Sequence, residues 1–483
     1  MTFSRQFAVP VVFLLILSSA LAIYLINQQP GYPWGGDAAL LMMHARNLAT
    51  GQPYARTHYV YDQEAWMEGT PSFPPGLPLL MAPVYRWSGM NLTAFRNYCT
   101  VLLAAALIPI FFFLRQSLSP WFACLALALA AVNRYPLGFI SGVSSECAYM
   151  LVSFLGLGLA IWIYHTRRNE TRPLAWGAMV GALAAATYAT RSIGIAFILA
   201  IGLYDLYRHR RPTRFLLAVG LVFAALFCAS NLLMHSDVAY ATQFRFNPSI
   251  NLKNVKDYAI DSLELWLGLP GRRWPRVILW LLTTLIALYG LRKAVERRGL
   301  SPVEFYVPCY FGILYFYWTA NGRYLAPLVP IYLVYLFGGI EALWARPKPQ
   351  PALRCALAGL MLVMAAAATG SVLRLDRSPL RDGVHTATYR EAVQYIRTET
   401  PSSARIVSDS ARYMALFTDR DSLFYPIQED PKAIAAFLAR IRADYVLVSK
   451  HHADDRAKLM PALALGTWQL VFHNAEYALF RLP

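Results

Sequence analysis

Five polar residues stand at the ends of long hydrophobic segments, where an ionisable side chain is costly. Asp37 follows the first such segment, and Glu146 opens a later one. Arg191, Arg323 and Tyr324 occupy short turns between other hydrophobic segments. Ionisable groups within a membrane protein are candidates for function unless they only pair with one another. Carboxylates together with guanidinium groups suit a substrate that has a nucleophilic hydroxyl and an anionic phosphate.

Each of these residues also has a purely structural interpretation. Asp37 stands where the N-cap of a helix belongs, and Glu146 would be favoured by the dipole at a helix N-terminus. Arg191 could extend to lipid head groups or pair with Glu146. Arg323 is less easily explained in this way, because it and Tyr324 lie beside two prolines in the turn RYLAPLVP. The residue types alone leave the functional and structural interpretations open.

The stretch GGDAALLMMHARNLATGQPY, residues 35–54, carries Asp37. It begins with two glycines, which permit a turn, and residues 38–49 are predicted to form a short helix closed by Gly51. Apolar residues recur near helical spacing in this helix, which predicts that one face lies on a lipid surface. Asp37 would then be a carboxylate held at the outer edge of a membrane.

The composition is that of a polytopic membrane protein. Of the 483 residues, 57% are hydrophobic and only 15% are charged. The formal net charge of +17 does not indicate nucleic-acid binding, because the arginines cluster in short loops between hydrophobic segments. The six cysteines show no metal-ligand spacing and are interpreted as small buried apolar residues. They are Cys99, Cys124, Cys147, Cys228, Cys309 and Cys355.

About eleven hydrophobic segments are predicted to be transmembrane helices. They are residues 8–26, 99–114, 121–139, 147–164, 174–190, 193–207, 215–234, 275–291, 303–319, 325–344 and 353–372. The loops predicted to face the cytoplasm are basic, with Arg115, Arg167, Arg168, Arg208, Arg210, Arg211, Arg292, Lys293, Arg346 and Arg354. This bias predicts an integral plasma (inner) membrane protein with its N-terminus in the cytoplasm and its C-terminus outside it, in the periplasm.

Beyond residue 373 the charges become frequent and balanced, which predicts a small soluble α/β domain outside the cytoplasm at residues 374–483. Residues 1–373 would form the transmembrane module, with outer loops at 27–98 and 235–274. In the tail, helices are predicted at 388–399, 410–417 and 431–443, and strands at 404–408 and 444–449. Residues 468–482 are predicted to form a hairpin that turns at Asn474.

The motifs also occur in a characteristic order. An Asp follows the first span in a short helix that ends at Gly-x-x-Tyr, and a Pro-Pro-Gly-x-Pro-Leu-Leu turn comes next. A later acidic residue opens a span, followed by an Arg-x-x-Gly turn and an Arg-Tyr-Leu-x-Pro-Leu-x-Pro motif. This ordered set resembles the GT-C membrane glycosyltransferases. More narrowly, it resembles the protein O-mannosyltransferase and aminoarabinose transferase group, glycosyltransferase family 39, over the whole chain.

The resemblance implies a GT-C-like fold and an enzyme that uses a polyprenyl-phosphate-linked sugar as donor on the outer face of the membrane. Asp37 would match the family's first-loop catalytic Asp and act as general base, inverting the anomeric carbon, and Glu146 would match its second acidic position. Arg191 or Arg323, with Tyr324, would bind the donor phosphate. A monophosphate can leave with arginine help alone, so no obligatory metal or other cofactor is expected.

One departure from the family pattern affects the choice of substrate. Aminoarabinose transferases carry Glu-Lys before the Pro-Pro pair, whereas this chain has Ser72 and Phe73. This difference argues against lipid A aminoarabinose transfer and against a metal site built on that Glu. The sugar stays open, and the acceptor is a lipid, a glycan or a protein.

Three alternatives remain from the sequence. One is another GT-C activity with a diphosphate-linked donor, such as an oligosaccharide ligase or polymerase. Another is a lipid or sugar transporter, although transporters tend to show internal repeats and polar groups near mid-membrane, whereas here the charges sit at the outer ends. The third is a non-catalytic scaffold that presents the soluble tail, which would leave the outer carboxylates and arginines without a role.

Overall fold

The computed structural model describes residues 2–34, 36–65, 72–234, 246–269, 273–317, 319–346 and 350–482, with side chains from residue 8 onward. Parts of the two predicted outer loops, residues 66–71 and 235–245, therefore lie outside the described residues. The chain divides into two compact units. The first contains residues 1–28, 96–230 and 241–376, and the second contains residues 29–95, 231–240 and 377–483.

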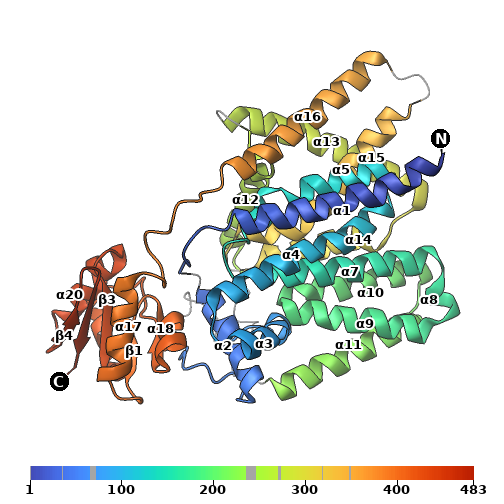
Figure 1. The fold of residues 1–483 in the computed structure, drawn as a ribbon. Helices are drawn as coiled ribbons and strands as arrows, with labels where there is room; N and C mark the ends of the chain where they lie inside the picture. The colour runs from blue at the N-terminus through green and yellow to red at the C-terminus, as the bar shows by residue number, and fades with distance from the viewer. Residues whose placement is uncertain are drawn as a thin grey trace. The chain divides into compact units, whose positions relative to one another are not determined.

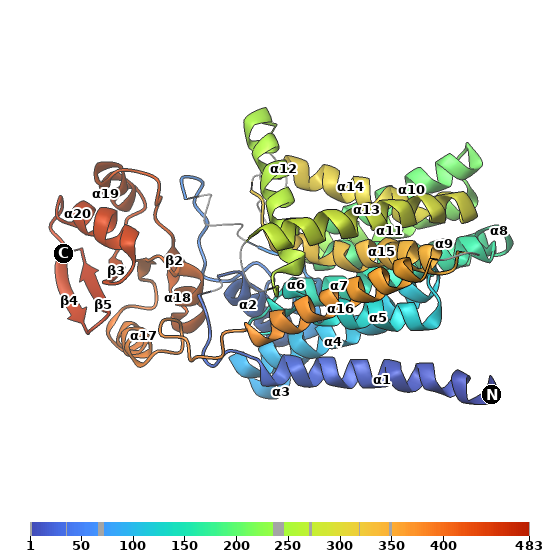
Figure 2. The same cartoon turned by 90° about the horizontal axis from the view of Figure 1, so that it is seen from above.

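The first unit is helical, and each predicted span coincides with a helix (Figure 1, Figure 2). These helices are α1 (Thr2–Ile26), α4 (Leu92–Arg115), α5 (Pro120–Ala131), α7 (Ser145–His165), α9 (Pro173–Thr190), α10 (Ile195–His209), α11 (Arg214–Leu233), α13 (Arg273–Arg298), α14 (Pro302–Phe316), α15 (Val329–Trp344) and α16 (Pro351–Leu373). Shorter elements are α6 (Arg134–Leu137), α8 (Arg168–Thr171), α12 (Pro248–Ser262) and the 3₁₀ turns η2 (Ser192–Gly194), η4 (Leu263–Trp266) and η5 (Gly322–Leu328).

Within the described residues, seven helices are long and apolar enough to cross a membrane by length and composition. They are α1, α4, α7, α11, α13, α15 with the preceding η5, and α16. The other helices that coincide with predicted spans, α5, α9, α10 and α14, are 12, 18, 15 and 15 residues long. The chain is a polytopic α-helical membrane protein, as its composition predicted.

Two of the predicted spans differ from the observed helices. The segment 121–139 was expected to be one helix, but α5 ends at Ala131 and Asn133 starts the short α6 by accepting a hydrogen bond from the Tyr135 N–H at 3.2 Å. The segment 325–344 begins as the 3₁₀ turn η5 because Pro327 lies within it, and the α-helix starts only at Val329. At both interruptions, backbone N–H and C=O groups near the ends of helices lack partners within an α-helix.

Close helix packing in the first unit depends on small residues. A Cβ atom on Gly290 of α13 would lie only 1.9 Å from the carbonyl oxygen of Tyr335 in α15, and one on Gly339 of α15 would lie 2.3 Å from that of Ile286. Neither position can hold a larger side chain without moving a helix. This is the packing expected between membrane helices, whose backbones approach closely where side chains are small.

The second unit combines α2 (Gly36–Thr50) and α3 (Gly76–Ser88) with an α/β part. The helices of that part are α17 (Ala387–Glu399), α18 (Ala411–Thr418), α19 (Pro431–Arg440), the π-helix η6 (Asp455–Leu459) and α20 (Met460–Leu463). Its strands are β1 (Arg405–Val407), β2 (Asp421–Leu423), β3 (Tyr445–Ser449), β4 (Gln469–His473) and β5 (Tyr477–Arg481). The helices and strands predicted for the tail are confirmed, although α19 ends at Arg440, and η6, α20 and β2 are additions.

The five strands form one mixed sheet in the order β2-β1-β3-β5-β4. β1 pairs in parallel with β2 and β3, with Ile406 opposite Tyr445, whereas β5 is antiparallel to both β3 and β4. Apolar side chains of β3, α19 and α20 form the core on one side of the sheet, among them Val446, Phe437 and Leu463. β2 is only three residues long, so its sequence carries no alternating pattern.

The helix that carries Asp37 differs from the prediction in two respects. α2 begins at Gly36, so Asp37 lies in its first turn and is not the N-cap. Residues 38–43 are all buried, so α2 does not present one face to lipid, as its periodicity had suggested. It packs against α3 on one side and α18 on another. Apolar periodicity alone cannot distinguish a lipid surface from a protein surface.

His44 connects α2 to the loop that follows it. Its ring is fully buried and stacks on Tyr54 with 4.1 Å between the ring centroids. The Phe73 N–H donates to Nε2 at 3.3 Å, so Nδ1 carries the proton and donates to the Tyr54 carbonyl at 2.9 Å. Burial, together with the nearby Arg412 charge, lowers the pKa of His44 to about 4, although the Tyr54 carbonyl opposes this shift.

This environment predicts acid sensitivity of the second unit. Above the unfolded-state pKa of about 6.5, His44 is neutral in both states. As the pH falls from there to about 4, the unfolded chain binds a proton that the folded chain excludes, so stability is lost in this window. The unfolding temperature of the full chain should therefore fall over this range, and less steeply in His44→Gln, which donates and accepts without titrating. Equal slopes for both proteins would contradict the assignment.

Candidate active site

Asp37 forms an ion pair with an arginine from the α/β part of its own unit. Nη1 of Arg412, in α18, donates to Asp37 Oδ1 at 3.0 Å. The Asp37 side chain is 42% exposed, whereas that of Arg412 is only 3% exposed. One carboxylate oxygen is therefore held in place while much of the carboxyl group stays accessible.

Arg412 is itself held by aromatic rings. Its guanidinium carbon lies 5.0 Å from the ring centroid of Tyr59 and 5.6 Å from that of Phe73, within range of cation–π attraction. Both rings belong to the loop after α2, which is joined to β2 by hydrogen bonds from the Val60 and Ser422 N–H groups. A buried, preorganised guanidinium thus orients the carboxylate that the sequence analysis selected. Arg412 was not among the residues predicted from the sequence to have a function.

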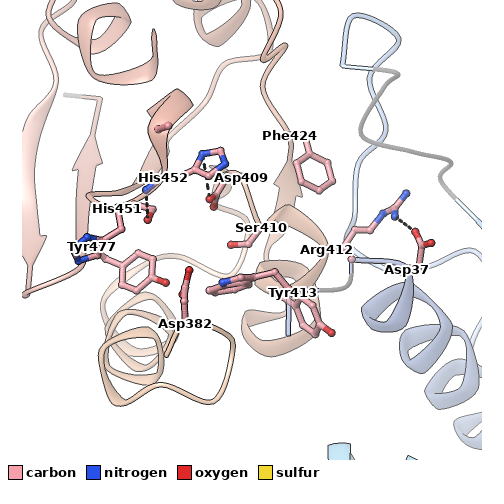
Figure 3. Close-up of a pocket in the computed structure, with 14 residues that line it drawn as sticks. Asp37, Asp382, Asp409, Ser410, Arg412, Tyr413, Phe424, His451, His452 and Tyr477 are labelled. Carbon is pink, nitrogen blue, oxygen red and sulfur yellow. Dashed lines mark hydrogen bonds and ion pairs between the residues drawn. The ribbon is translucent and has the colours of Figure 1, made fainter. Parts of the chain in front are cut away.

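A cavity of about 440 Å³ opens beside this ion pair. Figure 3 shows Asp37 and Arg412 at one side of it, with Asp382, Asp409, His452 and other polar residues of the α/β part across from them. Trp34, Tyr413, Phe424 and Tyr477 add aromatic rings to the lining. A polar cavity with aromatic walls suits a ligand that is rich in hydroxyl groups.

In the first unit, the structure brings together the other four residues that the sequence analysis selected. Arg191 Nη1 forms an ion pair with Glu146 Oε1, and Arg323 Nε lies 3.5 Å from the same oxygen. The guanidinium carbons of the two arginines lie 5.1 Å and 5.2 Å from the ring centroid of Tyr324. The pairing of Arg191 with Glu146, one of the two structural alternatives for Arg191, is therefore present.

Helix ends and turns position this cluster. Glu146 lies in the first turn of α7, where the Ser144 hydroxyl donates to Oε2 at 2.5 Å. Arg191 follows the last residue of α9 in extended backbone. The Asn321 side chain caps η5 by accepting from the Arg323 N–H at 3.0 Å. The charged groups therefore project from the ends of apolar helices, as the sequence pattern indicated.

The charged side chains of this cluster differ in exposure. The two guanidinium groups share the carboxylate of Glu146. The Glu146 side chain is 3% exposed and that of Arg191 is 15% exposed, but that of Arg323 is 38% exposed and can reach a ligand. Glu146 therefore holds two arginines together that would otherwise repel each other, and the cluster suits an anion such as a phosphate.

The candidate residues thus form two groups in different units. Glu146, Arg191, Arg323 and Tyr324 form the cationic cluster of the first unit, whereas Asp37 pairs with Arg412 in the second. Glu146, expected to be a second catalytic acidic residue beside Asp37, lies instead against the two arginines that were expected to bind the donor phosphate.

Similarity to solved structures is strong in fold and weak in sequence. ArnT from Cupriavidus metallidurans, solved with undecaprenyl phosphate, matches with a TM-score of 0.58 over 97% of each chain at 11% identity. The archaeal oligosaccharyltransferase AglB from Archaeoglobus fulgidus, solved with an inhibitory peptide and a dolichol-phosphate, has a TM-score of 0.57 at 12% identity. That match covers 90% of this chain and 69% of AglB.

No protein-family model matches the chain, and no curated protein gives a significant sequence match. Both solved structures are GT-C glycosyltransferases. At such low identity the similarity establishes the fold, which the order of motifs had predicted. The chain has the GT-C fold of the membrane glycosyltransferases.

Proposed function

We propose that the protein is an inverting glycosyltransferase that moves a sugar from a polyprenyl-phosphate carrier to an acceptor hydroxyl on the outer face of the plasma membrane. The observation that carries the proposal is the fold match over 97% of ArnT, whose structure holds undecaprenyl phosphate. The acceptor is a lipid, a glycan or a protein of the cell envelope.

Asp37 is the general base of the proposed reaction. It removes the proton from the acceptor hydroxyl while that oxygen forms a bond to the anomeric carbon of the sugar. The bond between this carbon and the phosphate oxygen breaks at the same time, and the polyprenyl phosphate leaves with the electron pair. Arg412 holds one oxygen of Asp37 and so fixes the direction from which the carboxylate acts. Base catalysis of this kind contributes roughly 10²–10⁴-fold.

The cationic cluster binds the phosphate of the donor and of the leaving group. Arg323 is the exposed arginine of the pair, and its planar fork can contact two phosphate oxygens at once. Arg191 adds a second charge, Tyr324 supports both guanidinium groups, and Glu146 keeps the two together. In this arrangement Glu146 is a positioning residue, and its carboxylate is already engaged.

The proposed transfer uses no obligatory metal ion. The carboxylate of Glu146 is paired with Arg191 and Arg323, and that of Asp37 is paired with Arg412. A divalent cation at either carboxylate would lie next to a guanidinium group and be repelled by it, so neither carboxylate fits a metal site. Among the described residues, the side chains with metal-ligand spacing form another group, which contains neither Asp37 nor Glu146.

The proposal requires the α/β part to lie outside the cytoplasm. The basic loops between the predicted spans support this orientation. A reporter that is active only in the cytoplasm, fused after Leu482, should therefore be inactive, whereas the same reporter fused after Arg210 should be active. Activity from the fusion at Leu482 would contradict the proposed topology.

The function itself is tested in cells. Mass spectrometry of the cell-envelope glycans and lipids should show the loss of one specific sugar modification in a deletion strain, and its return when the wild-type gene is restored. Restoring the gene with Asp37→Asn should not return it. An unchanged set of glycans and lipids in the deletion strain would contradict the proposal.

A further inference from the structure

The α/β part carries a second group of side chains that the proposed reaction does not use. Asp409 lies just after β1, and His452 and Asp455 lie just after β3. Because β1 and β3 are adjacent and parallel, their carboxyl ends meet at one edge of the sheet. After β1 the chain continues through α18 to β2 on one side, and after β3 it continues through η6 and α20 to β4 on the other. Ligands bind preferentially where connections diverge in this way.

The spacing of the three side chains is that of a ligand set. One atom from each lies within 4.8 Å of the other two. His452 Nδ1 is 3.3 Å from Asp455 Oδ1 and 3.7 Å from Asp409 Oδ2. Ligands at roughly 2.1 Å from a metal ion lie about 3.0–3.4 Å from one another. The 3.3 Å separation also meets the geometry of a direct hydrogen bond between His452 Nδ1 and Asp455 Oδ1, which a metal ion at the site would replace.

The surroundings hold these side chains in place. Asp455 is fully buried, its Oδ1 accepts from the Tyr425 hydroxyl at 2.5 Å, and its Oδ2 accepts from the Ser449 N–H at 2.7 Å. The backbone N–H of His452 donates to Ser449 Oγ at 3.3 Å. Metal ligands are typically oriented by hydrogen bonds of this kind from a second layer of residues. A divalent ion would balance the charges of both carboxylates, whereas the imidazole of His452 can balance only one of them.

The side of this group that faces the cavity leaves space for further ligands. Asp409 and His452 line the 440 Å³ cavity together with Ser410, Ser449 and His451, and Figure 3 shows the His452 ring directed toward the Asp409 carboxylate. Three protein ligands would leave coordination positions for water or for an oxygen atom of a molecule in the cavity. One imidazole nitrogen and two carboxylate oxygens suit Zn²⁺ or Mn²⁺ better than Ca²⁺.

We propose that Asp409, His452 and Asp455 bind one divalent transition-metal ion, with Zn²⁺ as the best match. The ion connects the loop after β1 to the loop after β3 and forms part of the cavity wall. This site is independent of the proposed glycosyl transfer, in which no step uses it. Its presence or absence therefore leaves the assignment of Asp37 and the arginine cluster unchanged.

The experiment measures metal binding by the full-length protein. The chain is purified in detergent with an affinity tag that contains no histidine, treated with EDTA, and titrated with Zn²⁺ alone and with Mn²⁺ alone. We expect one Zn²⁺ per chain. His452→Ala and Asp409→Asn should each weaken binding by at least the roughly 10–100-fold that is typical of changes around metal ligands. His451→Ala, which removes the adjacent histidine from the same cavity, is the matched control and should bind as the wild type does.

A second measurement guards against misfolded variants. Co²⁺ in place of Zn²⁺ should give the visible absorption of a coordinated ion in the wild type and in His451→Ala, and lose it in His452→Ala. Unfolding temperatures recorded without metal establish that the variants are folded. Zn²⁺ binding that is absent in the wild type, or that is equal in the wild type and a folded His452→Ala, would overturn the proposal.

Discussion

Asp37→Asn should insert, fold and bind donor as the wild type does, while sugar transfer falls by at least about a hundredfold. The amide has the same shape as the carboxylate and can still accept a hydrogen bond from Arg412. It cannot accept the acceptor's proton at neutral pH. Transfer and donor binding should be measured side by side on purified proteins, because only the first is expected to change.

The structure also supplies a matched control for this variant. Arg46 and Asp419 form a second ion pair between α2 and the end of α18, at 2.8 Å. Asp419 has a positive φ of 52°, a conformation that Asn also tolerates. Asp419→Asn should therefore remove a similar ion pair and leave transfer near the wild-type rate. Near-normal transfer in Asp37→Asn, or an equal loss in Asp419→Asn, would make Asp37 a structural partner of Arg412.

Arg323→Ala should weaken donor binding by about 1.5–3 kcal/mol, the typical contribution of a hydrogen bond to a charged group, which is roughly a 10- to 150-fold rise in Kd. Arg323→Lys should weaken it less, because lysine keeps the charge but loses the planar fork. Binding is measured with a polyprenyl-phosphate-linked sugar and with polyprenyl phosphate alone. Both should be affected, because the contact is to the phosphate.

A similarly exposed arginine of the same unit serves as the control. Arg134 is 41% exposed and forms an ion pair with Glu264 at 2.7 Å, compared with 38% exposure for Arg323. Arg134→Ala should leave donor binding unchanged. Equal donor affinity in wild type and Arg323→Ala would remove Arg323 from the phosphate site and leave Arg191 as the candidate.

Much of the fold could be predicted because its signals are local. Long apolar runs coincide with helices, and the basic loops between them set the expected topology. Glu146, Arg191 and Arg323 were found for the same reason, since a charged residue stands out among apolar ones. Their mutual contacts follow from helix ends that meet, which the order of the motifs suggested.

What could not be predicted depends on contacts between distant parts of the chain. Arg412 lies 375 residues from Asp37, in an amphipathic helix where an arginine is unremarkable. The burial of residues 38–45 of α2 has the same origin, because α3 and α18 pack against the helix whose apolar face its periodicity had assigned to lipid. The metal-ligand spacing of Asp409 with His452 likewise depends on the pairing of β1 with β3.

The most direct test of the proposed function uses the purified protein in vesicles with a lipid extract of its native membranes, which contains the lipid-linked sugars and acceptors. Mass spectrometry then follows the carrier lipid. Wild type should release polyprenyl monophosphate in step with sugar transfer, and Asp37→Asn should release at most about one hundredth as much. Release of a polyprenyl diphosphate, or no release of carrier by the wild type, would contradict the proposed monophosphate donor.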